Sequence, residues 1–137
     1  MIVTDEAQLI SANRSFYTAF ARGDFTAMDA LWAKSVAVCC VHPGWSPVRG
    51  RDKVMSTWEG ILQHPPQPAI QPLGEQATIM GNVGMVVGFE AIGDVTLVAT
   101  NIFVLEDGAW KMVHHQAAIT ERAPRAPEPT RNPGRLH

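Results

Sequence analysis

The chain has 137 residues, of which 46% are hydrophobic and 18% are charged, and its formal net charge is -2. This length predicts one domain that buries its own core, and the composition excludes an intrinsically disordered chain. The near-neutral charge argues against binding to nucleic acid, and no apolar stretch reaches the roughly 18 residues that a membrane helix needs. The N-terminal residues also lack the pattern of a signal peptide, so we expect a cytoplasmic protein that contacts neither nucleic acid nor membrane.

Two helices are predicted at the start of the chain. Hydrophobic residues recur every three to four positions between Asp5 and Arg22, which predicts an amphipathic helix with an aromatic stripe. Gly23 suits the end of that helix, and Asp24 suits the start of a second short helix that runs through Trp32. We therefore expect a tight helical hairpin.

A short strand and a third helix follow. The apolar run from Val36 to Val41 predicts a strand, which Pro43 and Gly44 terminate, so that His42 lies at the strand end. After a loop that contains Pro47, helical spacing of hydrophobic residues predicts a third helix over residues 51–63.

The second half of the chain predicts four strands, over residues 69–80, 83–92, 95–106 and 109–119. The Asp107-Gly108 pair between the last two strands is typical of a two-residue hairpin turn, which requires positive φ angles at both positions. Residues 1–121 are expected to form the domain. Residues 122–137, rich in proline and arginine, are expected to be a flexible tail.

The hairpin turn also predicts which residues share one face of the sheet. Counting back from Asp107-Gly108 places Asn101 opposite His114 and puts Phe103, Met112 and Gln116 on the same face. A bulged turn would shift the register by one residue and exchange His114 for His115. The sequence leaves both histidines open as the one that faces the helices.

The opposite face of these strands is too apolar for a sheet surface that lies wholly in water, since it carries Val98, Ile102 and Val104. The three helices are needed on the other face. A second copy of the chain is the simplest cover, which predicts a homodimer through the sheet face.

Metal and thiol chemistry are not expected. His42, His114 and His115 could be considered as metal ligands, but neighbouring strand residues point to opposite faces and no carboxylate is placed to complete a site. Cys39 and Cys40 lie in an apolar strand, where burial raises a thiol pKa and makes the sulfur unreactive. We expect no metal and no cofactor.

Three short motifs follow one another along the chain: Gly23-Asp24, then Arg49-Gly50-Arg51, then residues 107–111 with the sequence DGAWK. In this order the chain resembles the SnoaL-like, ketosteroid-isomerase-like superfamily, which also contains nuclear transport factor two. The resemblance implies an α+β fold shaped like a cone, in which three helices pack in a strongly curved, mostly antiparallel sheet and leave an apolar pocket. It also implies a dimer.

The resemblance further implies positions for site residues. Isomerases of this superfamily place a carboxylate base at the end of the first strand, where this chain has His42, and their oxyanion-binding Tyr and Asp fall near Phe16 and Asn101. Phe16 cannot donate a hydrogen bond, and Tyr17 lies about 100° around the helix. We therefore expect His42 or His114 to transfer protons, with Asn101 stabilising charge or orienting water. The expected ligand-contacting residues are Phe16, Phe20, Trp45, Trp58, Phe103, Met112 and Gln116.

Two functions remain open from the sequence. The first is an enzyme that isomerises, dehydrates or hydrolyses a small apolar cyclic or carbonyl compound through histidine acid–base chemistry. The alternative is a non-catalytic module of the same fold that binds a ligand or only dimerises.

Overall fold

The aromatic stripe of the first helix determines where that helix lies. In the computed structural model, which describes residues 5–121, α1 (Asp5–Arg22) runs across one face of the sheet with Leu9, Phe16 and Phe20 buried beneath it. The chain then turns at Gly23, whose φ of 62° suits a residue without a Cβ atom.

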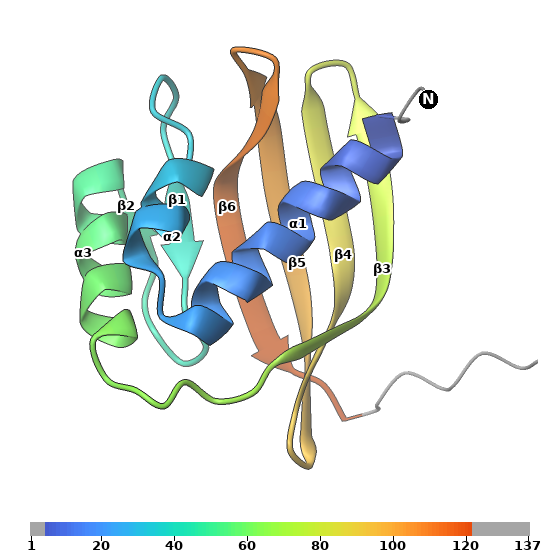
Figure 1. The fold of residues 1–137 in the computed structure, drawn as a ribbon. Helices are drawn as coiled ribbons and strands as arrows, with labels where there is room; N and C mark the ends of the chain where they lie inside the picture. The colour runs from blue at the N-terminus through green and yellow to red at the C-terminus, as the bar shows by residue number, and fades with distance from the viewer. Residues whose placement is uncertain (1–4, 122–137) are drawn as a thin grey trace, which may run out of the picture.

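Two further helices pack beside α1 on the same side of the sheet (Figure 1). The short helix α2 (Phe25–Leu31) begins after Asp24, whose side chain accepts a hydrogen bond from the Ala27 amide at 3.0 Å. The Arg51 guanidinium at the start of α3 (Arg51–Leu62) donates to the carbonyl oxygens of Asp29, Trp32 and Ala33. These bonds tie α3 to the end of α2.

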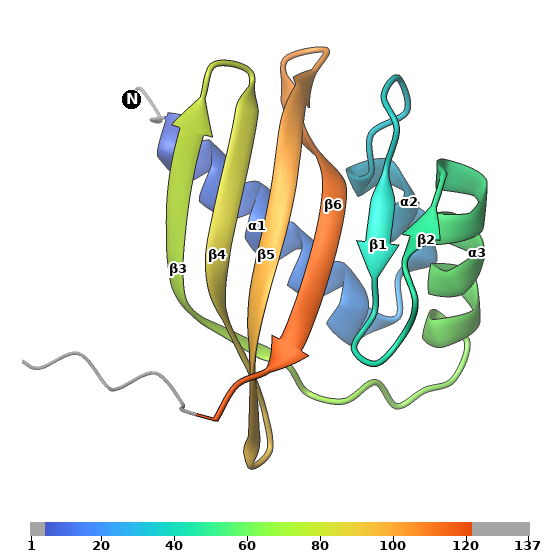
Figure 2. The same cartoon turned by 180° about the vertical axis from the view of Figure 1, so that it is seen from behind.

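Within residues 5–121, six strands form one curved, unclosed sheet in the order β2-β1-β6-β5-β4-β3. Their bounds are β1 (Cys39–Val41), β2 (Val48–Arg49), β3 (Gln71–Met80), β4 (Val83–Ile92), β5 (Val95–Glu106) and β6 (Ala109–Ile119). All neighbouring pairs are antiparallel except β1 and β6, which are parallel. The parallel pair brings the end of β1, and therefore His42, beside β6. Figure 2 shows that none of the helices within residues 5–121 covers the opposite face of the sheet.

This architecture confirms the predicted α+β cone of three helices and a strongly curved, mostly antiparallel sheet. The last three strands have the predicted bounds, whereas β1 begins only at Cys39 instead of Val36. The two-residue strand β2 was not predicted, because residues 48–49 follow Pro47 in a stretch too short to show alternation.

The register between β5 and β6 differs from the simple count back from the turn. Asp107-Gly108 does form a two-residue turn, and Phe103 pairs with Met112 as predicted. A bulge then follows between Ile102 and Phe103, so that Asn101 pairs with His115 and Ile102 with His114. The expected pairing of Asn101 with His114 is therefore wrong, and the extra residue is inserted within the ladder instead of at the turn.

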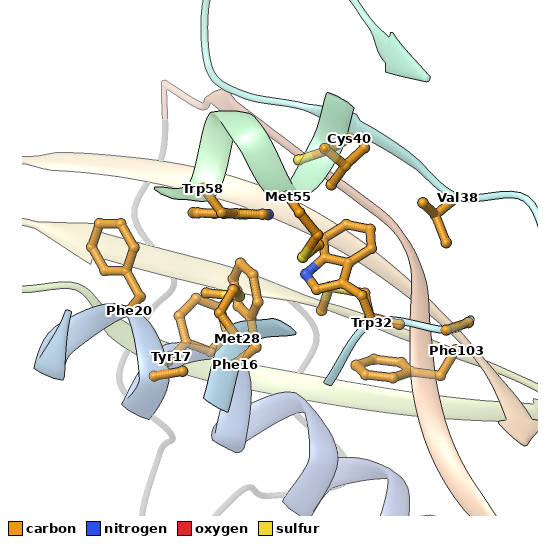
Figure 3. Close-up of a cluster of buried hydrophobic side chains, with 14 of the residues drawn as sticks. Phe16, Tyr17, Phe20, Met28, Trp32, Val38, Cys40, Met55, Trp58 and Phe103 are labelled. Atoms are coloured by element: carbon orange, nitrogen blue, oxygen red, sulfur yellow. The ribbon is translucent and has the colours of Figure 1, made fainter. Parts of the chain in front are cut away.

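The main core fills the space between the helices and the sheet. Figure 3 shows Phe16, Tyr17 and Phe20 of α1 below Trp58 and Met55 of α3. Nearer the β1 end of the sheet, the core continues through Trp32, Phe103, Met112, Val38 and Cys40. This aromatic packing forms the walls of the site described next.

Candidate functional site

A cavity of about 240 Å³ lies at the edge of the aromatic core, bounded by α1, α3, the strands β4 and β6, and the segments that follow β1 and precede β3. Four aromatic side chains form part of its wall: Phe16, Phe20, Trp45 and Trp58. Its aliphatic residues are Pro43, Ile61, Pro68, Ile70 and Ile92. Three polar side chains complete the lining: His42, Glu90 and His115.

His42 follows the last residue of β1 and is held by α3. Its Nε2 lies 2.9 Å from the Thr57 hydroxyl, and that hydroxyl donates to the Val54 carbonyl oxygen at 2.7 Å. Because a hydroxyl has a single hydrogen, Nε2 of His42 must carry the proton and donate it to Thr57. Nδ1 of His42 is then left with a lone pair, 3.9 Å from the buried Sγ of Cys40. The ring edge also packs against Trp45 and Trp58, with centroid distances of 4.8 and 4.7 Å.

His115 is the end of a buried chain of hydrogen bonds that crosses four elements. Its Nδ1 lies 2.6 Å from Oδ1 of Asn101, whose Nδ2 donates to Asn13 Oδ1 at 2.8 Å and to the Tyr17 hydroxyl at 3.4 Å. Tyr17 in turn donates to Oε2 of Glu90 at 2.6 Å. Since Asn101 accepts through Oδ1, His115 carries its proton on Nδ1 and leaves Nε2 with a lone pair.

Burial controls the charge of the polar groups around the cavity. Desolvation lowers the pKa of His42 to about 4, and desolvation together with the nearby His42 and His114 lowers the pKa of His115 to about 3. Both imidazoles are therefore neutral at pH 7. Burial raises the pKa of the Glu90 carboxyl, while the hydrogen bond from Tyr17 acts in the opposite direction. Burial and the Glu90 carboxyl raise the pKa of the Tyr17 phenol, which stays protonated.

Trp58 carries a buried N–H group that has no hydrogen-bond partner among residues 5–121. The side chain is only 2% exposed. In Figure 3 the indole nitrogen of Trp58 lies on the side of Met55 and not of Phe20.

The structure brings together five of the residues predicted for the site: His42, Phe16, Phe20, Trp45 and Trp58. Asn101 lies behind the cavity and reaches it through His115. The other predicted residues lie elsewhere. His114 faces the opposite side of the sheet, beside Cys39 and Arg49; Phe103 and Met112 are enclosed in the core, and Gln116 is exposed. The bulge explains why His114 and Gln116 do not face the helices, because it reverses the expected orientation of every β6 residue after Val113.

Sequence reasoning missed Glu90, Tyr17 and Thr57 as parts of this site, and left His115 as an alternative. Glu90 could have been found, because it is the only charged residue in the apolar segment 83–92. A buried carboxyl within such a strand requires a partner, which here is Tyr17.

Residues 9–120 match the family model of the SnoaL-like domain. The chain belongs to the SnoaL-like family. This SnoaL-like chain is 28% identical to a protein of known structure from Streptomyces avermitilis, named as a candidate dehydratase of the NTF2-like family. The likeness covers 86% of this chain and 97% of that protein, with a TM-score of 0.79.

Two other proteins of different description are also similar to this SnoaL-like chain. A candidate association domain of calcium/calmodulin-dependent protein kinase type II from Thiobacillus denitrificans is 28% identical over 88% of this chain and 98% of its own, with a TM-score of 0.68. The F-box protein SKIP8 of Arabidopsis thaliana is 25% identical over 81% of this chain. The chain spans 49% of that relative, about half its length.

Two kinds of feature are absent from the described residues of this SnoaL-like domain. None of its helices is both long and apolar enough to cross a membrane. Among residues 5–121, no group of three or more His, Cys, Asp or Glu side chains is placed to hold a metal ion.

Proposed function

We propose that this SnoaL-like chain is an enzyme that transfers protons on a small, largely apolar molecule held in the cavity. The observation that carries the proposal is that two neutral histidines and one carboxyl group line the same aromatic cavity. Titratable groups with strongly shifted pKa values in a hydrophobic pocket are typical of acid–base sites.

The two histidines supply proton acceptors that do not have to lose a proton first. Nδ1 of His42 and Nε2 of His115 each have a lone pair, and the other nitrogen of each ring is fixed by a hydrogen bond. For His115, the chain through Asn101 and Tyr17 donates toward Glu90, so an ionised Glu90 stabilises an imidazolium there. Asn101 and Thr57 are accordingly positioning residues, which determine the tautomers of the two rings.

The proposal includes isomerisation, dehydration or hydrolysis as the overall reaction, because each begins with removal of a proton from carbon or water. The similarity to a protein named as a candidate dehydratase supports this class of chemistry. The remaining ligand contacts are proposed to come from the aromatic wall, with Phe16, Phe20, Trp45 and Trp58 against the apolar part of the substrate.

The test is exchange of carbon-bound hydrogen in heavy water, followed by NMR for a panel of small cyclic ketones, alcohols and amines. Exchange catalysed by the wild-type protein and reduced at least tenfold by His42→Gln or His115→Gln is expected. The matched control is His114→Gln, which changes the neighbouring residue on the other face of the sheet and should retain full activity. A loss in His114→Gln equal to that in His115→Gln would overturn the assignment.

A second candidate function is assembly through the uncovered face of the sheet. Val98 there is 36% exposed, and one relative is described as a kinase association domain. A second copy of this chain that covers this face would form a homodimer. Sedimentation equilibrium of the wild-type chain and of Val98→Lys tests this: a dimer that the variant dissociates supports it, and a wild-type monomer contradicts it.

A further inference from the structure

The polar atoms offered to the cavity are hydrogen-bond acceptors. His42 donates through Nε2 to Thr57, and His115 donates through Nδ1 to Asn101, so the nitrogen left on each ring can only accept. Glu90 accepts at Oε2 from Tyr17, and no residue in the described range donates to its Oε1. A ligand that matches this lining must bring hydrogen-bond donors.

At pH 7 the described residues that line the cavity can carry only negative charge. Glu90 is the only lining side chain in the described part of the chain that can carry a negative charge, and neither lysine nor arginine lines the cavity. Both histidines are neutral at pH 7, because burial lowers their pKa values to about 4 and about 3. A carboxylate or phosphate placed here would be buried without a counter-charge, whereas a cation would find one.

The aromatic wall favours the same kind of ligand. Four aromatic rings line the cavity beside Glu90, and two of them, Phe16 and Phe20, pack against a third, Trp58, at centroid distances of 5.4 and 6.2 Å. The face of an aromatic ring attracts a cation within about 6 Å of its centroid. The same rings also suit the hydrocarbon part of a ligand.

We propose that this cavity binds a small organic amine as its cation, with the ammonium group against Glu90 and the hydrocarbon part against the aromatic wall. The inference rests on the proposed function only in taking this cavity as the ligand site, since binding does not require turnover. Tyr17 keeps one carboxyl oxygen of Glu90 oriented and leaves Oε1 for the ammonium group.

A cationic ligand also suits the histidines. When an ammonium N–H bond breaks, its electron pair stays on the nitrogen of the ligand and its proton forms a new bond to a neutral imidazole. One positive charge moves, and no new charge is created in the cavity. Removal of a proton from an uncharged ligand would instead separate two charges in a buried space, which costs more.

The test compares four probes of similar size by calorimetry with the full chain: benzylamine, benzyl alcohol, benzoate and benzyltrimethylammonium. Benzylamine is expected to bind at least tenfold more tightly than benzyl alcohol, and benzoate is expected not to bind. Benzyltrimethylammonium has the charge but no N–H donor and should bind less tightly than benzylamine. Equal affinity for benzylamine and benzyl alcohol, or tighter binding of benzoate, would overturn the proposal.

A variant of Glu90 tests whether the ammonium group of the ligand binds at this residue. Glu90→Gln should weaken benzylamine at least tenfold and leave benzyl alcohol within twofold, whereas Glu59→Gln, at an exposed position of α3, should change neither. If Glu90→Gln does not fold, the wild-type protein alone suffices, because benzylamine binding should weaken as pH falls and the Glu90 carboxyl takes up a proton. Tyr17 of α1 acts on this titration through its hydrogen bond to Glu90, and the charge of Glu75 of β3 acts on Tyr17. The other titratable groups that face Glu90 across the cavity are His42 and His115 of β6.

The two proposals can fail separately. Amine binding with neither carbon-bound hydrogen exchange nor hydrolysis of any compound would leave the ligand class standing and contradict the enzyme. Exchange on uncharged ketones or alcohols, with no preference for the amine probe, would support the enzyme and contradict the ligand class.

Discussion

Asn101 stands opposite His115 in the sheet, and its Oδ1 accepts the hydrogen bond from Nδ1 of that histidine at 2.6 Å. The same amide donates to Asn13 and Tyr17 of α1. Asn101 is 1% exposed, so one buried amide joins a proposed proton acceptor to the helix that holds Glu90 in place.

Replacement of Asn101 by alanine is expected to lower the free energy of unfolding. The change leaves the buried polar groups of Asn13 and His115 without a partner, at a cost of about 1–3 kcal/mol for each group. Urea denaturation at pH 7 measures the loss. Thr100→Ala, on the neighbouring residue that pairs with Gln116 on the outer face, serves as the control. Equal losses in the two variants would show that the amide network contributes nothing specific.

The two cavity histidines are expected to be opposite tautomers. Nitrogen-15 NMR at pH 7 should show His42 protonated at Nε2 and His115 protonated at Nδ1, because each donates through that nitrogen. Thr57→Val removes the acceptor of His42 and should disturb its spectrum, whereas Thr57→Ser retains the hydroxyl and should not. The assignment fails if His42 carries its proton on Nδ1 in the wild-type protein.

Acid should destabilise the fold through these histidines. Because the folded-state pKa of His42 is lowered from 6.5 to about 4, the unfolded chain binds more protons between these pH values, so the free energy of unfolding falls as pH falls through that window. His115 likewise makes the free energy of unfolding fall as pH falls, down to about pH 3. Glu90 has the opposite sign, since its raised pKa gives stability that is lost as pH rises through the folded-state value.

Comparison of the wild type with His42→Gln isolates the contribution of His42 to the pH dependence of stability. Between pH 6.5 and pH 4, His42→Gln should lose less stability than the wild type in urea titrations at each pH. His64→Gln, in the exposed loop after α3, provides the comparison and should follow the wild-type curve. Parallel curves for the wild type and His42→Gln would contradict burial of a neutral imidazole.

Close packing of α1 on the sheet predicts opposite effects for two glycine substitutions. A Cβ atom at Gly84 of β4 would lie 2.7 Å from a methyl carbon of the buried Leu9, so Gly84→Ala should cost about 1–3 kcal/mol through overpacking. Gly60 of α3 has no atom within 4 Å of that position, and Gly60→Ala should raise stability by up to about 1 kcal/mol. Melting temperatures of both variants measure these effects, and a neutral Gly84→Ala would show that Leu9 can move aside.

Trp45 at the cavity should report on occupancy. It is 50% exposed, while Trp32, Trp58 and Trp110 are buried, so acrylamide should quench mainly Trp45. A ligand in the cavity should reduce this quenching, and Trp45→Phe should abolish most of it. Strong quenching that persists in Trp45→Phe would place the accessible indole elsewhere.

The sequence predicted the fold better than the site, for reasons that particular residues make clear. Helical periodicity located α1, and the Asp107-Gly108 turn gave β5 and β6 their bounds, because these patterns are local. The choice between His114 and His115 depends on a bulge that no local pattern marks. Thr57 and Tyr17 meet His42 and Glu90 only through packing of separate elements, which a single sequence does not encode in any spacing.

The parallel pairing of β1 with β6 has a consequence for how this protein can be screened. The cavity takes side chains from residue 16 to residue 115, so its wall is complete only when the two ends of the domain have met. A compound that binds there cannot be bound by an unfolded chain, so it raises the free energy of unfolding by RT ln(1 + [L]/Kd), where [L] is the free ligand concentration. A rise in melting temperature with ligand concentration is therefore a direct measure of occupancy, available before any reaction has been identified.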